Sequence, residues 1–344
     1  MILNAKNFEA AIENAKKFTD KKHKATDGVW LTDNTVMSTD FNIYYKEKID
    51  NMSEDICPIV FLNSQIIQNI MDYLKTFKKD KSDFIFELRD SDILIDNVSV
   101  DKIVVKPEEM PVFPGEEKEL FNSKYSLSGE LLESFRTLFF NNSSLKKSVK
   151  NGFYESRNYS AFVYLINDKA MWTNGHLIQE ISNTGLSDIN ILLLVDMFLK
   201  CKKFTGEFSL SYYTYKNKDD KEITAVTINN GATTIAYQLP LNDIRYPEYS
   251  QISGIIDGVK SEMLEYGKDS LLKEAILSKK IPRTKESKPV STINLKVETS
   301  FNFDYLNFIL SFFKDKVRII SNDENQFSPV VFKGERLFVL MPLR

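Results

Sequence analysis

The chain has only two cysteines, Cys57 and Cys201, among its 344 residues, and it contains no CxxC motif. A disulfide framework is therefore excluded, and a reducing compartment is favoured. No apolar stretch approaches the roughly 20 residues that a membrane-spanning helix needs. The N-terminal segment MILNAKNFEAAIENAKKF also lacks the pattern of a secretory signal. These absences lead us to expect a cytoplasmic protein with no membrane partner.

Residues that could carry catalysis are also scarce. The two histidines, His23 and His176, lie far apart and have no cysteine or histidine neighbours at metal-binding spacing. The segment YGKDS at 266–270 contains a Gly-Lys pair but lacks the upstream glycine of a phosphate-binding loop. Acidic pairs such as Asp219 and Asp220 occur in turn-like segments, which is typical of solvated loops. We therefore expect no cofactor, no metal site and no catalytic residues.

The net charge of −3 excludes a generally basic protein that coats nucleic acid. It does not exclude a basic surface on an otherwise acidic body, because the local electrostatic field steers DNA. Apolar residues make up 42% of the chain and charged residues 27%, which is typical of globular proteins. The length indicates two or three domains rather than one core.

What the sequence does contain is a repeat that recurs about six times. Each repeat has a strand, an amphipathic helix that ends in lysines, and then several strands of alternating apolar and polar residues. In the first repeat, Phe8, Ala11, Ile12 and Ala15 share one helical face. In the second repeat, Ser64 is the expected N-cap of the helix. The six helices are predicted at residues 6–24, 64–81, 130–150, 188–204, 269–280 and 301–316.

Two repeats span about 115 residues, the usual size of one domain. We therefore predict an α+β protein of three repeated domains, in which curved antiparallel sheets carry helices on one face. The predicted domains are 1–118, 119–249 and 250–344. The third is shortened, because only IPRTKESKPV separates the fifth helix from the next strand and strands of that repeat are missing.

Lysines gather at the end of every predicted helix. For one helix alone, the negative end of the helix dipole explains such lysines. If all six helices line one surface, the same lysines form a basic stripe that fits DNA phosphates without reading bases. The lysines that we expect to face DNA are Lys16, Lys17, Lys21, Lys24, Lys75, Lys78, Lys79, Lys146, Lys147, Lys150, Lys200, Lys202, Lys203, Lys279, Lys280 and Lys314.

Four short segments resemble the bacterial β sliding clamp, the β subunit of DNA polymerase III. They are VWLTDNTVMSTDFNIYYKEKI at 29–49, MWTNGHLIQEI at 171–181, IRYPEYSQI at 244–252 and FVLMPLR at 338–344. The resemblance implies domains of two βαβββ units each, and a ring of two subunits with helices facing the central hole and sheets outside. The departures from the family pattern are compatible with a divergent, slightly shortened clamp, such as one encoded by a phage or mobile element.

In the family, the second, third and fourth of these segments form an apolar groove that binds short peptides of partner proteins. Asn174, Leu177 and Gln251 depart from the family's usual residues, so the preferred peptide is expected to differ. Strand alternation turns Phe338 and Leu340 away from the groove. The groove expected here consists of Thr173, Gly175, His176, Leu177, Ile178, Pro247, Gln251, Ile252, Val339, Met341, Pro342, Leu343 and Arg344. For His176, the alternative to peptide contact is a role in stabilising the turn.

The resemblance also places the predicted helix 269–280 at the contact between subunits. Ile276 and Leu277 would be its apolar anchors. The first-domain edge that would face them, VSVDKIVV at 98–105, lacks an obvious aromatic partner.

The function that the resemblance implies is that of a non-enzymatic processivity factor. Such a homodimeric ring encircles double-stranded DNA without regard to sequence, in the cytoplasm at the nucleoid. Its groove tethers the replicative polymerase and the clamp loader. Two alternatives stay open: a clamp-like scaffold that binds partners without encircling DNA, and a nuclease that uses scattered carboxylates.

Overall fold

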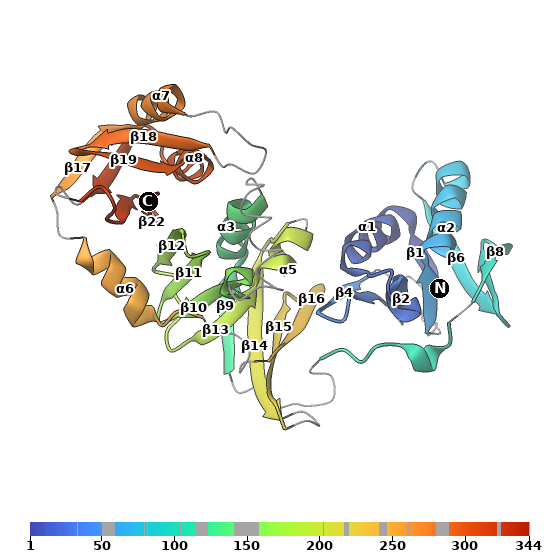
Figure 1. The fold of residues 1–344 in the computed structure, drawn as a ribbon. Coiled ribbons are helices and arrows are strands. Elements are labelled where there is room, and N and C mark those ends of the chain that lie inside the picture. Colours follow the sequence, from blue (N-terminus) through green and yellow to red (C-terminus); the bar gives the residue numbers. More distant parts are fainter. Residues whose placement is uncertain are drawn as a thin grey trace. The chain divides into compact units, whose positions relative to one another are not determined.

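The computed structural model describes residues 1–32, 34–49, 59–78, 80, 82–103, 105–114, 123–140, 158–201, 203–216, 220–240, 246–259, 262–279, 289–321 and 325–343. The chain divides into two compact units. Figure 1 labels the helices and strands along the chain. The first compact unit contains Met1–Phe135 and Met197–Asp243, and the second contains Arg136–Asp196 and Ile244–Arg344.

The first two repeats follow the predicted order of strand, helix and three strands. The first repeat consists of β1 (Ile2–Asn4), α1 (Ala5–Ala15), β2 (Gly28–Thr32), β3 (Thr35–Thr39) and β4 (Ile43–Lys48). The second repeat consists of β5 (Val60–Asn63), α2 (Ser64–Phe77), β6 (Asp83–Arg89), β7 (Asp92–Ile95) and β8 (Val98–Lys102).

The third and fourth repeats have the same order of elements. The third repeat consists of β9 (Ser123–Ser128), α3 (Gly129–Phe140), β10 (Phe162–Ile166), β11 (Lys169–Thr173) and β12 (Leu177–Ser182). The fourth repeat consists of β13 (Asn190–Leu194), α5 (Val195–Lys200), β14 (Glu207–Lys216), β15 (Glu222–Asn229) and β16 (Thr233–Pro240).

Among the described residues, the last two repeats together contain fewer strands than the earlier pairs. A helix, α6 (Tyr249–Gly258), precedes them. The fifth repeat consists of β17 (Met263–Gly267), α7 (Lys268–Ser278) and β18 (Val290–Leu295), and the sixth consists of β19 (Val297–Asn302), α8 (Phe303–Ser311), β20 (Lys316–Ile320), β21 (Val330–Lys333) and β22 (Leu337–Leu340). Within its described residues, the fifth repeat therefore has one strand after its helix where the complete repeats have three.

Asparagine at the end of a strand starts three of the helices. Asn4, Asn63 and Asn302 are the N-caps of α1, α2 and α8. The Asn63 side chain accepts a hydrogen bond of 2.9 Å from the backbone N–H of Ile66, which satisfies one of the free donors in the first helical turn. The predicted cap at Ser64 was therefore wrong by one residue.

Neighbouring repeats exchange their first strands. Strand β1 pairs with β6 of the second repeat, and β5 pairs with β2 of the first. The same exchange joins β9 to β14, β13 to β10, β17 to β20 and β19 to β18. Each repeat thus completes its sheet only with its neighbour, which supports grouping the repeats in pairs. The exact domain boundaries stay a prediction.

Each compact unit contains one eight-stranded antiparallel sheet. In the first unit the strand order is β5-β2-β3-β4-β16-β15-β14-β9, and in the second it is β13-β10-β11-β12-β22-β21-β20-β17. The two four-stranded halves of each sheet meet at β4–β16 and at β12–β22. These junctions occupy strand edges that would otherwise be open templates for aggregation.

The predicted helix at 188–204 was wrong in its first half. Residues Asn190–Leu194 form β13, and only Val195–Lys200 are helical. Strand β13 pairs with β10 over five residue positions, and four of its five residues are buried. A continuous apolar run fits a buried strand as well as a buried helix, so the pairing with β10 decides between the two.

Candidate functional site

Strand β22 lies in the second compact unit between β12 and β21. Val339 is opposite Ile178 on one side and Val331 on the other. These three residues form a buried cluster with Met171 and Ile252. Phe338 lies on the opposite face of the sheet, where its ring contacts Phe308 and Phe312 of the α8 region at centroid distances of 6.2 and 5.2 Å. Strand alternation therefore orients Phe338 away from the apolar cluster, as the sequence predicts.

The residues after β22 are held by two backbone hydrogen bonds. The N–H of Met341 donates to the carbonyl of His176 at 2.9 Å, and the N–H of Leu343 donates to the carbonyl of Ser300 at 2.8 Å. Met341, Pro342 and Leu343 are half-buried. The apolar tail is thus anchored to the turn before β12 and to β19 while part of its surface remains accessible.

The turn at 173–177 is organised by Asn174. Its side-chain oxygen accepts hydrogen bonds from the backbone N–H groups of His176 and Leu177 at 3.0 and 2.9 Å. Its amide nitrogen donates to the Tyr305 hydroxyl at 2.9 Å. Gly175 has φ 84°, a left-handed conformation that favours glycine. Asn174 therefore joins the turn to α8 as well as shaping the turn.

We expect Asn174→Ala to destabilise the protein by about 1–3 kcal/mol, because it removes three hydrogen bonds from a buried side chain. Chemical denaturation would measure the change. Tyr305→Phe is the matched variant, since it removes only the bond to α8 and should cost about 1 kcal/mol. A loss below about 0.5 kcal/mol for Asn174→Ala would contradict this role.

Helix α6 covers the apolar cluster and was not predicted. Ile252 is 3% exposed within that cluster, and Ile255, Ile256 and Val259 pack against it at helical spacing. This spacing is the sequence signal that predicts the helix. Tyr249, the first residue of α6, holds the start of the helix by a hydrogen bond with Lys169.

A polar cluster anchors α6 to the sheet. The Lys169 ammonium donates to Glu180 at 3.0 Å and to the Tyr249 hydroxyl at 2.5 Å. Burial lowers the pKa of Lys169, but the hydrogen bonds to Tyr249 and Glu180 outweigh it, and the net pKa is raised. In addition, the Tyr246 hydroxyl donates to the carbonyl of Met171 at 3.1 Å. The segment from Tyr246 into α6 is therefore fixed by polar contacts at its beginning and apolar contacts along its length.

The described members of the predicted groove all belong to the second compact unit, but their exposure differs. Gly175, His176 and Gln251 are exposed, and Pro247, Met341, Pro342 and Leu343 are half-buried. Arg344 lies outside the described residues. The buried members are Thr173, Leu177, Ile178, Ile252 and Val339. Leu177 is opposite Leu340, so it lies on the face of the sheet that is turned away from Ile178 and Val339.

The predicted DNA-facing lysines also differ in their surroundings. In the described part of the chain, the exposed ones are Lys16, Lys17, Lys21, Lys24, Lys75, Lys203, Lys279 and Lys314. Lys16 and Lys17 follow α1 in a short 3-10 turn rather than ending the α-helix itself. Lys78 pairs with Asp96 at 3.3 Å. The members that lie outside the described residues are Lys79, Lys146, Lys147, Lys150, Lys202 and Lys280.

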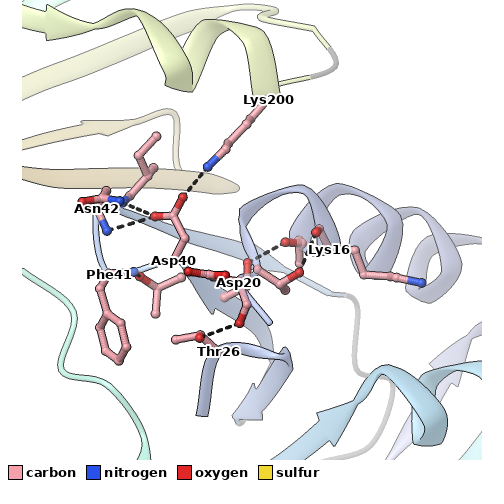
Figure 2. Close-up of polar contacts among 12 residues, drawn as sticks. Lys16, Asp20, Thr26, Asp40, Phe41, Asn42 and Lys200 are labelled. Carbon is pink, nitrogen blue, oxygen red and sulfur yellow. Dashed lines mark hydrogen bonds and ion pairs between the residues drawn. The ribbon is translucent and has the colours of Figure 1, made fainter. Parts of the chain in front are cut away.

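Lys200 occupies a different kind of position. Its ammonium forms an ion pair with one carboxylate oxygen of Asp40 (Figure 2). The other oxygen accepts hydrogen bonds from the backbone N–H groups of Asn42 and Ile43 at 2.9 and 2.8 Å. In the same view the Lys16 ammonium points away from this pair. Lys200 therefore holds α5 to the turn between β3 and β4, and a role in DNA contact stays a prediction.

The predicted subunit contact on α7 is exposed. Ile276 is 54% exposed and Leu277 is 76% exposed. In the first compact unit, Phe77 at the end of α2 is 68% exposed and its ring lies 4.8 Å from that of Tyr73. Helix α2 packs beside β8, which is an edge strand. The sequence near β8 offered no aromatic residue, whereas α2 supplies two.

Among the described residues, no group of three or more His, Cys, Asp and Glu side chains is placed to hold a metal ion. No helix in the described part of the chain is both long and apolar enough to cross a bilayer.

No protein-family model matches the chain. No curated protein is significantly similar to it in sequence. Among solved structures, the Helicobacter pylori β clamp bound to a DNA ligase peptide has a TM-score of 0.71 at 15% identity. The Bartonella birtlesii sliding clamp bound to griselimycin has a TM-score of 0.72 at 13% identity. The Bacillus subtilis sliding clamp has a TM-score of 0.70 at 10% identity.

The first two structural matches cover 100% of this chain and 99% of the other chain, and the third covers 100% and 98%. A similarity of this kind extends over the whole repeat arrangement and not over one domain alone. The chain has the α+β fold of the bacterial β sliding clamp, as its four sequence segments predict.

Proposed function

We propose that this chain is a DNA polymerase processivity factor that closes into a homodimeric ring around duplex DNA. The observation that carries the proposal is the full-length similarity to sliding clamps from end to end of both chains. Exposed lysines near the ends of α1, α2 and α8 fit such a role, because phosphate attraction is independent of sequence. A ring is retained by topology, so this attraction can be weak enough to permit sliding.

We further propose that the surface around the C-terminal tail binds short peptides of the polymerase and the clamp loader. Two clamps of the same fold are bound to a DNA ligase peptide and to griselimycin. In this chain, half-buried Met341, Pro342 and Leu343 lie beside exposed His176, to which the tail is hydrogen-bonded. Methionine and leucine make a deformable apolar surface that suits several ligands. Binding through a tether raises the local concentration of polymerase at the template.

Ring closure requires a contact between two different surfaces of the two copies. Exposed Ile276 and Leu277 form one apolar patch, and exposed Phe77 with Tyr73 offers an aromatic patch for a second copy. Exposed large apolar side chains that cluster in this way usually mark a partner site. A head-to-tail contact between unlike surfaces closes into a ring when the rotation between copies permits it.

Leu277→Asp is expected to convert the dimer to a monomer, because it places a charge in the apolar contact. Multi-angle light scattering would measure the mass at several concentrations. Phe327→Asp is the matched control, since Phe327 is 48% exposed but belongs to neither proposed patch. A wild-type chain that stays monomeric at all concentrations would contradict ring formation.

The shortened fifth repeat favours one alternative, a clamp-like scaffold that binds partner peptides without encircling DNA. Within its described residues, this repeat has a single strand after α7. Retention on DNA separates the two functions. A topologically linked ring stays on nicked circular DNA and slides off after the DNA is linearised, whereas a scaffold shows no such difference.

A further inference from the structure

Strands β18 and β19 form a sheet of only two strands in the described part of the chain. In the first two repeats, the equivalent strands have the order β5-β2-β3-β4, in which β18 corresponds to β2 and β19 to β5. The described residues of the fifth repeat contain no counterpart of β3 or β4. The side of β18 that faces away from β19 is therefore a strand edge, and an open edge is a template for pairing with another chain.

Helix α7 lies along this edge and occupies its backbone groups. The Ser278 hydroxyl donates to the carbonyl of Thr292 at 2.7 Å and accepts from the N–H of the same residue at 2.9 Å. One carboxylate oxygen of Glu274 accepts from the N–H of Asn294 at 2.7 Å. The backbone groups of alternate residues point to the same side of an antiparallel strand, so these are the groups that a neighbouring strand would bind. Side chains of α7 thus replace the missing strand.

The two faces of α7 have different surroundings. Glu274 and Ser278 are four residues apart, so they lie on the same face of the helix. On that side, Ala275 is fully buried, and its carbonyl accepts a hydrogen bond of 2.7 Å from the buried Ser291 hydroxyl. Leu277, in contrast, is 76% exposed. The face that covers the β18 edge is therefore separate from the face that we propose for ring closure.

The sequence of β18 favours pairing with another strand. The segment VSTINL at 290–295 contains three β-branched residues and no charge, proline or glycine. Such a segment has a high tendency to add to a strand edge, and charged side chains are a common protection against it. The outer edge of β19 is covered in another way, since the Ser300 carbonyl accepts from the N–H of Leu343 at 2.8 Å. On β18 the protection comes from α7.

We propose that α7 is an edge cover, and that β18 of a second copy of this chain pairs with the β18 edge when the Glu274 and Ser278 contacts are lost. Two copies of the same uncharged edge present matching N–H and C=O groups in an antiparallel arrangement, and a two-fold contact of this kind is self-complementary. The contact goes beyond the proposed function, because it needs neither DNA nor a ring.

The test is the double variant Glu274→Ala and Ser278→Ala of the full-length chain. At low protein concentration, hydrogen–deuterium exchange in 290–295 is expected to be at least about tenfold faster than in the wild-type chain, because the hydrogen bonds to α7 are lost. At higher concentration, multi-angle light scattering should show a mass above that of the wild-type chain. Asp269→Ala with Ser270→Ala is the matched control, since it removes an exposed acid and an exposed serine from the same helix and should leave both measurements unchanged.

A third substitution identifies the surface that associates. Asn294 is exposed on β18, and Asn294→Lys places a charge on the edge. Added to the double variant, it should return the mass to that of the wild-type chain while exchange in 290–295 stays fast. General misfolding would not be reversed by one added lysine.

Unchanged exchange or unchanged mass in a folded double variant would overturn the proposal, and so would association that Asn294→Lys does not reverse. If the double variant does not fold, Ser278→Ala alone is measured in the same way and decides the question by the same outcomes. Failure of ring formation gives a different result, because Leu277→Asp is expected to lower the mass, whereas loss of the edge cover raises it.

Discussion

A chain that ends at Leu340 is expected to lose all stimulation of its polymerase while it keeps its fold. Strand β22 ends at Leu340 and remains paired with β12 and β21, so the sheet is retained. The deletion removes the accessible apolar surface of Met341, Pro342 and Leu343, together with two backbone hydrogen bonds. Primer extension on a long circular template, with the replicative polymerase of the same organism, would measure the stimulation.

Circular dichroism and thermal unfolding of the truncated chain provide the control for folding. A point variant, Met341→Ser, changes the same surface without shortening the chain and is expected to weaken stimulation in the same direction. Phe327→Ser is its matched control, because it alters an exposed apolar residue elsewhere in the second compact unit. Full stimulation by the truncated chain would remove the assignment of the tail to partner binding.

Charge reversal at exposed lysines near three helix ends is expected to weaken the interaction with DNA in a salt-dependent manner. The triple variant Lys16→Glu, Lys75→Glu and Lys314→Glu changes residues near the ends of α1, α2 and α8. The slope of log affinity against log salt is negative, and each lost phosphate contact reduces its magnitude by about 0.9. The magnitude of the slope is therefore expected to fall by up to about 3 in the triple variant. Fluorescence anisotropy with duplex DNA across a salt series would measure this slope.

The matched control reverses three lysines that lie on strands, through Lys102→Glu, Lys216→Glu and Lys333→Glu. These variants change the net charge equally but leave the helix ends intact. If both triple variants changed the salt slope to the same extent, the helix ends would have no special role. Lys200→Met is expected to differ from both, since it removes an ion pair with Asp40 and should lower stability more than DNA affinity.

Hydrophobic periodicity predicted the helices best where one face alone is buried. In α1 the buried residues are Ala5, Phe8, Ala11, Ile12 and Ala15, which repeat every three or four residues. The same method failed at Asn190–Leu194, because a strand buried on both faces has no such period. It also left α6 unassigned, although Ile252, Ile255 and Ile256 carry the helical spacing.

The candidate site shows the same division at the level of single side chains. Local pattern was enough to turn Phe338 away from Val339, because successive strand residues point to opposite faces. Pattern could not show that Asn174 donates to Tyr305, a residue 131 positions later in the chain. The pattern also could not distinguish Lys200 from exposed lysines such as Lys16. Lys200 pairs with Asp40, which lies far away in the sequence in the turn between β3 and β4.

Local periodicity was sufficient for the repeat and the fold class, because each helix and strand shows its own apolar pattern. The resemblance to clamps came from four short segments of the sequence. Long-range pairing settled the exchange of first strands, the burial of Ile178, Ile252 and Val339, and the partners of Asn174 and Lys200. Those contacts join residues far apart in the chain. Their energies depend on which groups folding brings together, and a linear pattern does not contain that information.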